Sequence, residues 1–285
     1  MSEIWLSAET RPRGFLRKVM GTRKTRRPVA CGRAWPAAAS SHLLSMVPLL
    51  ALNLLGGVRL EAADPHELLV HADRVRNAWQ EGVLKLRVTT TKPGAAPVTG
   101  LFEVEVKGGE KSRIRFLDPV DEGKMVVTIR DDAWLLLPTA SNPIKIPKSH
   151  RLGGGFSVAD LSRTKFSEDY DAVLERVDEY KDATCDVIRL IAKSGRNPPY
   201  PVVRVWIDRK EGLYRRAVFL VASGKTAKDT TFDSYRSFHG VLAVATMTIV
   251  DALRPGSTFV EYLDGEKRPV SDAVFDLKTA RTAVR

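Results

Sequence analysis

FEVEVKGGEKSRIRF, residues 102–116, holds two short segments in which apolar and charged residues alternate. In the first, apolar residues at 102, 104 and 106 are separated by glutamates, and in the second, apolar residues at 114 and 116 flank an arginine. Gly108 and Gly109 stand between the two segments and are typical turn residues. A period of two puts apolar side chains on one face of a strand and charged ones on the other. The stretch therefore predicts an antiparallel hairpin with one buried and one wet face.

The same alternation continues along the chain, with turn residues between the segments. Further strands are expected at 125–129, 133–137, 172–180, 184–192, 202–208, 213–221, 230–238, 241–251 and 258–263. Strands do not alternate with long helices, so a parallel α/β fold is not expected. Because a long flat sheet is unusual, the pattern predicts a mainly β fold, a curled antiparallel sheet of roughly a dozen strands.

Residues 1–63 are expected to be a leader, and residues 64–285 a single folded domain. The uncharged run LLSMVPLLALNLLGGV at 43–58 follows the basic stretch RKTRRP at 23–28. Ala62 and Ala63 come just before Asp64. The order basic, apolar, small is that of a secretory signal peptide, which predicts cleavage between Glu61 and Pro65. The alternatives are an uncleaved anchor and a true start at Met20.

The basic residues are concentrated in this leader. Of the net charge of +11, residues 1–63 carry +7 and the remainder +4. A small excess on the folded part is an ordinary solvated surface. A nucleic-acid partner is therefore not expected.

Residues 65–80, PHELLVHADRVRNAWQ, have apolar positions three and four apart and predict an amphipathic helix ended by Gly82. A second helical signal lies in the stretch RLGGGFSVADL at 151–161, where Ser157 and Asp160 have capping-box spacing.

Three glycines at 153–155 precede this short helix and permit the backbone to bend. They lack the Gly-Lys-Ser/Thr that completes a phosphate-binding loop. Residues 153–161 are therefore expected to form a lid over the open edge of the sheet, with Phe156 and Leu161 contacting a ligand or plugging an empty cavity. The alternative is a static loop packed on the outside.

Residues that carry chemistry are sparse. His66 and His71 flank Glu67 as in a zinc-protease motif, but they are five residues apart and so point about 140° apart on a helix. Cys185, the one cysteine after the leader, has no nearby histidine in sequence to activate it. The acidic pairs lie in turns, where acids are common. We therefore expect no catalytic residue, no metal and no cofactor.

Aromatic residues and methionines form the remaining large group. They are Phe102, Phe116, Met125, Trp134, Trp206, Phe219 and Met247. For any one of them, ordinary core packing is the simpler interpretation. Together they are suited to line an apolar cavity, since lipid sites are concave and mostly apolar.

Three stretches resemble the outer-membrane lipoprotein-sorting proteins, the LolA/LolB-like superfamily. They are RIRFLDPVDEGKMVVTIRDDAWLLLP at 113–138, RLGGGFSVADL at 151–161 and EYLDGEKRPVSDAVFDLKTA at 261–280. The resemblance implies a half-barrel closed by helices and a loop. Its apolar interior would receive the acyl chains of a lipoprotein, in the periplasm and without a cofactor. Carried over by position, Arg115 matches the family's arginine before an aromatic residue, and Trp134 and Leu136 match its cavity-side strand.

The expected function is therefore a periplasmic carrier or chaperone for lipoprotein acyl chains or another envelope lipid such as a phospholipid. Its partners would be an inner-membrane exporter and an outer-membrane acceptor. The alternative is a non-enzymatic accessory module of an envelope exporter, or a sensor of lipoprotein stress. An enzyme acting on envelope lipids is disfavoured by the missing nucleophile and base. The expected ligand-binding residues are Phe102, Arg115, Phe116, Met125, Trp134, Leu136, Phe156, Leu161, Trp206, Phe219 and Met247.

Overall fold

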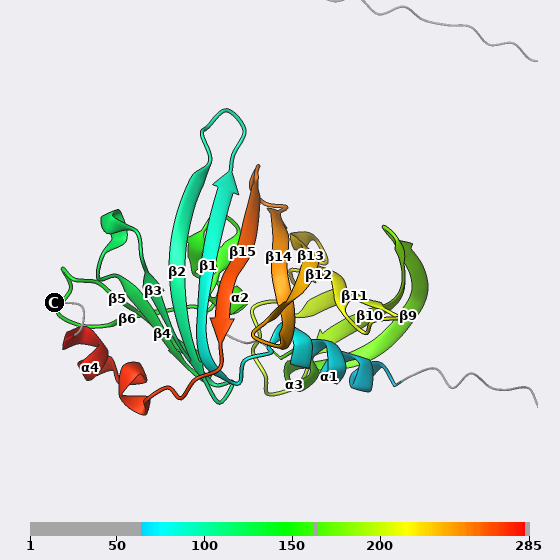
Figure 1. Ribbon diagram of the computed structural model, residues 1–285. Coiled ribbons are helices and arrows are strands. Elements are labelled where there is room, and N and C mark those ends of the chain that lie inside the picture. The colour runs from blue at the N-terminus through cyan, green and yellow to red at the C-terminus, as the bar shows by residue number, and fades with distance from the viewer. Residues whose placement is uncertain (1–63, 162–164, 283–285) are drawn as a thin grey trace, which may run out of the picture. The chain divides into compact units, whose positions relative to one another are not determined.

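The computed structural model describes residues 64–161 and 165–282. The leader predicted for residues 1–63 lies outside the described residues. The predicted mainly β fold is confirmed, because thirteen strands form one antiparallel sheet (Figure 1). Their order is β6-β5-β4-β3-β2-β1-β15-β14-β13-β12-β11-β10-β9. The strands are β1 (Glu81–Thr91), β2 (Val98–Lys107), β3 (Lys111–Phe116), β4 (Met125–Ile129), β5 (Asp132–Leu136), β6 (Ile144–Ile146), β9 (Tyr170–Tyr180), β10 (Ala183–Ala192), β11 (Val202–Asp208), β12 (Tyr214–Leu220), β13 (Thr226–Phe238), β14 (Val241–Asp251) and β15 (Ser257–Glu266).

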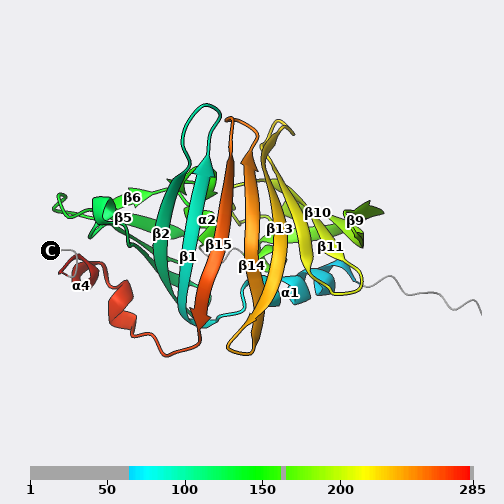
Figure 2. The ribbon, with the colours of Figure 1, turned by 45° about the horizontal axis from the view of Figure 1, so that its top comes forward.

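Two meanders make up this sheet, and they meet where β1 pairs with β15. All other neighbouring strands are consecutive in the chain, as short hairpin turns require. Register shifts interrupt several strands, for example between Val187 and Ile188 in β10 and between Trp206 and Ile207 in β11. Bulges bend a strand and increase its twist. The sheet curls accordingly and leaves β6 and β9 at its two ends, the expected half-barrel (Figure 2).

The first helix, α1 (Pro65–Arg76), confirms the predicted helix but ends before residue 80. Asp64 caps its start by accepting a hydrogen bond from the backbone N–H of His66 at 3.0 Å. Trp79 lies beyond the helix and packs on Gly265, where a Cβ atom would stand 2.3 Å from the Trp79 ring. The indole therefore covers the end of β15, where glycine leaves room for it.

The main core fills the concave face of the sheet. A small hairpin of β7 (Arg151–Gly153) and β8 (Phe156–Ser157) leads into α2 (Val158–Leu161). In Figures 1 and 2, α2 lies behind β1 and β15, between the two arms of the sheet. Phe156 and Leu161 are buried in this core. Helix α3 (Phe166–Asp169) packs with α1 elsewhere on the same face, and none of the helices in the described ranges is long and apolar enough to span a membrane.

The convex face of β3 to β5 is covered by the C-terminal segment. This segment contains the 3₁₀ helix η2 (Asp272–Phe275) and α4 (Leu277–Thr282). Phe275 is 1% exposed and packs in a cluster with Met125 and Leu136. The Asp272 carboxylate holds the segment in place through Lys107 and Lys111, each at 2.8 Å.

Candidate functional site

An open pocket of about 680 Å³ lies at the end of the sheet where β1 ends and β2 begins, at the top in Figure 1. Three segments line it: the β1–β2 hairpin between residues 88 and 102, the loop at 116–121, and residues 152–154 at the β7–β8 hairpin. Its volume falls within the range of small-molecule sites, which is about 300–1,000 Å³. Apolar side chains make up most of its lining, so it is suited to a hydrophobic ligand.

Aromatic rings form the inner wall of this pocket. The rings of Phe102 and Phe116 meet edge-on with centroids 5.0 Å apart, and Phe102 also meets Phe156 edge-on at 6.4 Å. Phe102 and Phe116 pair across β2 and β3 and therefore point to the same, concave face. The Lys124 ammonium lies 4.3 Å from the centroid of the Phe116 ring. Two of the predicted ligand-binding residues, Phe102 and Phe116, are thus in the pocket wall.

The rim of the pocket exposes apolar side chains to water. Val98 is 70% exposed and Val120 is 90% exposed. Val120 lies in the 3₁₀ helix η1 (Pro119–Asp121), which the Asp118 carboxylate positions by accepting a hydrogen bond from the Leu101 N–H at 2.8 Å. Both valines therefore lie exposed at the mouth of the pocket.

The β7–β8 hairpin forms the wall between the pocket and the interior. Gly154 has a φ of +53°, and a Cβ atom there would come within 2.3 Å of the Thr258 hydroxyl oxygen and 2.4 Å of the Thr90 hydroxyl oxygen. The Gly155 N–H donates to the Thr258 hydroxyl at 2.8 Å. The glycines therefore let the hairpin, which has a register shift between Arg151 and Gly153, pack directly on β1 and β15.

The helix after this hairpin is capped as predicted. The backbone N–H and the hydroxyl of Ser157 donate to the Asp160 carboxylate at 2.8 and 2.7 Å. Lys228, 4% exposed on β13, places its ammonium 2.7 Å from the same carboxylate. The alternative of a loop packed on the outside is wrong, because Phe156 is fully buried and Leu161 is 5% exposed in the core.

Lys228 was not anticipated from the sequence. Its position two and four residues before Thr230 and Phe232 puts it on the buried face of β13, and that spacing is the signal that identifies it. A lysine on an apolar face needs an acid partner, because an unpaired buried charge is costly.

Met125, Trp134 and Leu136 were expected to face inward with Phe116, and the structure corrects this. Met125 pairs with Leu136, and Trp134 pairs with Val127, two residues beyond Met125 on β4. Met125, Trp134 and Leu136 therefore share the convex face, together with Arg115, which pairs with Met125 from β3. Phe116 is adjacent to Arg115 in the chain and points the other way. Both faces of β4 are buried, so hydrophobic alternation could not tell them apart.

The remaining expected site residues are distributed over three places. Phe219 and Met247 pack in the concave core with Phe156 and Leu161. Trp206 lies in a separate cluster with Val187 and Val218, under the Arg216 guanidinium, whose carbon is 4.9 Å from the ring centroid. Arg115 is partly exposed on the convex face and forms an ion pair with Glu103. None of Trp206, Phe219, Met247 or Arg115 lines the pocket.

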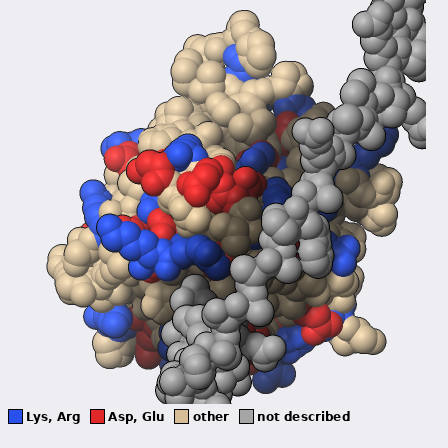
Figure 3. Space-filling view, turned by 90° about the vertical axis from the view of Figure 1, so that its right-hand side faces the viewer, with Lys and Arg blue, Asp and Glu red and all other residues tan. Residues whose placement is uncertain are grey.

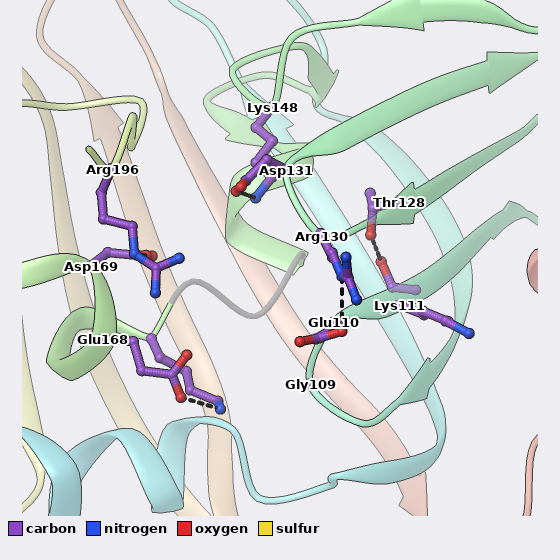
Figure 4. Close-up of a pocket in the computed structure, with 12 residues that line it drawn as sticks. Gly109, Glu110, Lys111, Thr128, Arg130, Asp131, Lys148, Glu168, Asp169 and Arg196 are labelled. Atoms are coloured by element: carbon purple, nitrogen blue, oxygen red, sulfur yellow. Dashed lines mark hydrogen bonds and ion pairs between the residues drawn. The ribbon is translucent and has the colours of Figure 1, made fainter.

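A second, smaller cleft is strongly polar (Figure 4). Its cations are matched by acids: Arg130 with Glu110 at 3.4 Å, and Lys148 with Asp131 at 3.2 Å. Burial raises the pKa of Asp169, another carboxyl in this cleft. Because the opposite charges are paired, the cleft resembles an ordinary surface ion-pair network.

The same mixture of charges covers the face seen in Figure 3, where acidic and basic side chains lie next to each other. On β9 to β11, for example, Glu175 accepts from Arg204 at 2.8 Å and lies 3.5 Å from Arg189. Within the described ranges, no three His, Cys, Asp or Glu side chains are grouped to bind a metal ion. Cys185 is buried, and burial raises the pKa of its thiol to about 11, so it is a poor nucleophile.

Comparisons with known proteins agree with this fold, an open curled sheet with an inserted hairpin. A family model described as an uncharacterized protein matches residues 108–281. The chain therefore belongs to this family. A search of curated proteins found no match.

Solved structures with this fold cover most of the chain. A LolA superfamily protein from Nitrosomonas europaea is 24% identical with a TM-score of 0.69, covering 75% of this chain and 98% of its own. A DUF1329 family protein from Desulfovibrio piger is 20% identical with a TM-score of 0.67, covering 78% and 100%. A putative outer membrane lipoprotein-sorting protein domain from Vibrio parahaemolyticus is 18% identical with a TM-score of 0.65, covering 76% and 98%. The resemblance to the lipoprotein-sorting superfamily is thus confirmed at the level of the fold.

Proposed function

We propose that this protein is a periplasmic carrier that binds an acyl chain of a lipoprotein or another envelope lipid and releases it toward the outer membrane. The observation that carries the proposal is the 680 Å³ pocket, with aromatic rings on its inner wall and exposed valines on its rim. Burial of each methylene group contributes about 0.8 kcal/mol, so part of one chain is already a substantial ligand.

The hairpin of β7 and β8 would act as the lid in this proposal. Phe156 fills the space directly behind the pocket, where it meets Phe102. Outward movement of the hairpin would extend the pocket into the concave face and admit a longer chain. The ion pair between Lys228 and Asp160 would hold the lid closed in the empty protein.

The rim provides a direct test. Val98→Asp and Val120→Asp place a carboxylate at the mouth of the pocket, on side chains so exposed that folding should be unaffected. We expect each to weaken binding of a neutral monoacyl probe, monolauroylglycerol, by about tenfold, because the bound chain would then lie against a charge. The measurement is calorimetric titration of the full chain.

Leu242→Asp is the matched control, because Leu242 is a 48% exposed apolar residue at the opposite end of β14. It should bind the probe like the unmodified protein. Equal affinities in all four proteins, or no binding in any, would contradict a lipid site at this mouth.

A second candidate is a non-enzymatic accessory module of an envelope exporter. It is favoured by the well-filled core behind the hairpin, in which Phe156, Leu190 and Ile249 are fully buried. The two candidates differ in the periplasm-purified protein: a carrier should yield co-purifying lipid in an organic extract analysed by mass spectrometry, and a module should yield none.

A further inference from the structure

We propose that the ligand of this pocket is an amphiphile with an anionic phosphate headgroup, and that Lys92 and Arg254 bind the headgroup. The inference rests on the proposed function, since it assumes that the apolar pocket holds an acyl chain. It adds the chemical class of the lipid.

A smaller pocket of about 280 Å³ adjoins the apolar one. The two pockets are continuous around the tip of the β7–β8 hairpin, because their walls share Thr90, Lys92, Leu152, Gly153 and Gly154. Beyond the shared residues, the smaller pocket is lined by the start of β15 and the β14–β15 turn. Its lining includes Thr90, Thr91 and Ser257, whose hydroxyl groups are of a type that donates to phosphate oxygens, whereas the Thr258 hydroxyl is buried against Gly155.

The charge of the smaller pocket is positive. It contains Lys92, Arg151 and Arg254 and a single acid, Asp251. The Asp251 carboxylate is already engaged, because it pairs with Arg151 and accepts from the Leu253 N–H at 2.9 Å. Among the described residues, no carboxylate lies within 4.0 Å of the side-chain nitrogens of Lys92 or Arg254. Two cations are thus left for a ligand.

Some exposed cations of the sheet are paired with acids. Arg87 meets Glu261 at 2.8 Å, and Lys145 meets Asp132 at 2.7 Å. Lys92 and Arg254 instead line one pocket together without such a partner, and charge complementarity indicates an anionic ligand there.

The charges also orient the ligand. The acids of the apolar pocket are Asp118 and Asp121, on its η1 side. Asp118 accepts from the Leu101 N–H at 2.8 Å, and Asp121 lies 3.4 Å from the Lys124 ammonium. A phosphate would be attracted to the cationic side near the β14–β15 turn, and the chain would extend over Phe102 and Phe116.

The test compares three probes on the full chain by calorimetric titration: dodecyl phosphate, monolauroylglycerol of the same chain length, and inorganic phosphate. The unmodified protein should bind dodecyl phosphate about tenfold more tightly than monolauroylglycerol, and this advantage should shrink as salt is added. The double variant Lys92→Gln/Arg254→Gln should lose the advantage and keep its affinity for monolauroylglycerol.

The matched control is Lys210→Gln/Arg268→Gln, which removes two exposed cations that follow β11 and β15 at the opposite end of the sheet. It should retain the preference for dodecyl phosphate.

Equal affinity for dodecyl phosphate and monolauroylglycerol, or an unchanged preference in the Lys92/Arg254 variant, would overturn the headgroup assignment and leave the acyl site intact. Inorganic phosphate binding as tightly as dodecyl phosphate would also overturn it, in favour of a free-anion site. If neither dodecyl phosphate nor monolauroylglycerol binds, the proposed function itself is rejected.

Discussion

Asp73 is a buried carboxylate with three hydrogen bonds. It is 4% exposed, and it accepts from the N–H and hydroxyl of Ser167, each at 2.8 Å, and from the Tyr214 hydroxyl at 3.0 Å. These bonds tie α1 to α3 and β12. Burial nevertheless raises the pKa of Asp73 above its ordinary value of 3.8, while the hydrogen bonds and the nearby Arg76 oppose that rise.

A raised pKa has a definite consequence for stability. The folded state binds the Asp73 proton more readily than the unfolded state, so the free energy of unfolding falls as pH rises from 3.8 through the raised pKa. Asp73→Asn removes this titration and keeps an oxygen acceptor for Ser167. As pH rises above 3.8, we expect the free energy of unfolding of Asp73→Asn, measured with urea, to fall less or rise more than that of the unmodified protein. The same pH slope in both proteins would contradict this role.

The packing role of Gly154 could not be predicted from its residue type alone. A glycine triplet predicts a flexible loop, but here the absence of a side chain at Gly154 permits contact with Thr90 and Thr258. The partners of a close approach lie far away in sequence, so only the fold identifies them. Ser157 and Asp160 were predictable as a cap because their partners are local.

Among the elements, α2 is joined to β13 by a nearly buried ion pair. Lys228 and Asp160 are nearly buried, with side chains 6% and 11% exposed. Removing one partner of a buried pair leaves the other charge uncompensated and costs about 3–5 kcal/mol. Lys228→Met should therefore lower the free energy of unfolding by about 3 kcal/mol and speed the exchange of a bound monoacyl probe.

The double variant Lys228→Met/Asp160→Asn is the control for this prediction, because it leaves no uncompensated charge while the amide oxygen can still accept from Ser157. It should recover most of the stability lost by Lys228→Met in urea denaturation. A Lys228→Met protein as stable as the unmodified chain, with unchanged probe exchange, would show that the ion pair does not hold the hairpin.

The buried face of a strand could be predicted from the sequence where its two faces differ in polarity. The alternation of Phe102 and Val104 with glutamates correctly indicates which side of β2 is buried. In β4 the burial extends to both faces, so Met125 and Val126 gave equal signals although they point to opposite sides. The deciding fact is the C-terminal segment on the convex face, which hydrophobic periodicity in β4 cannot reveal.

At the scale of the whole domain, the two faces of the sheet are covered independently. The concave face holds the main core and borders the apolar pocket, and the convex face of β3 to β5 holds Met125, Val127, Leu136, Val270 and Phe275. The packing of the C-terminal segment thus contributes to stability on one side, while the proposed ligand binds at the other.

This separation makes a prediction that distinguishes the two faces. Phe275→Ala removes a 1% exposed ring from the convex cluster, which should lower the free energy of unfolding by about 3–5 kcal/mol. Trp134→Asp, in the same cluster, should also destabilise the fold, because a carboxylate would replace apolar contacts. Both variants, at a temperature where they remain folded, should bind monolauroylglycerol as the unmodified protein does, since neither residue borders the pocket. Reduced affinity in folded Trp134→Asp protein would mean that the ligand reaches the convex face, and that the site lies under the C-terminal segment rather than at the mouth of the half-barrel.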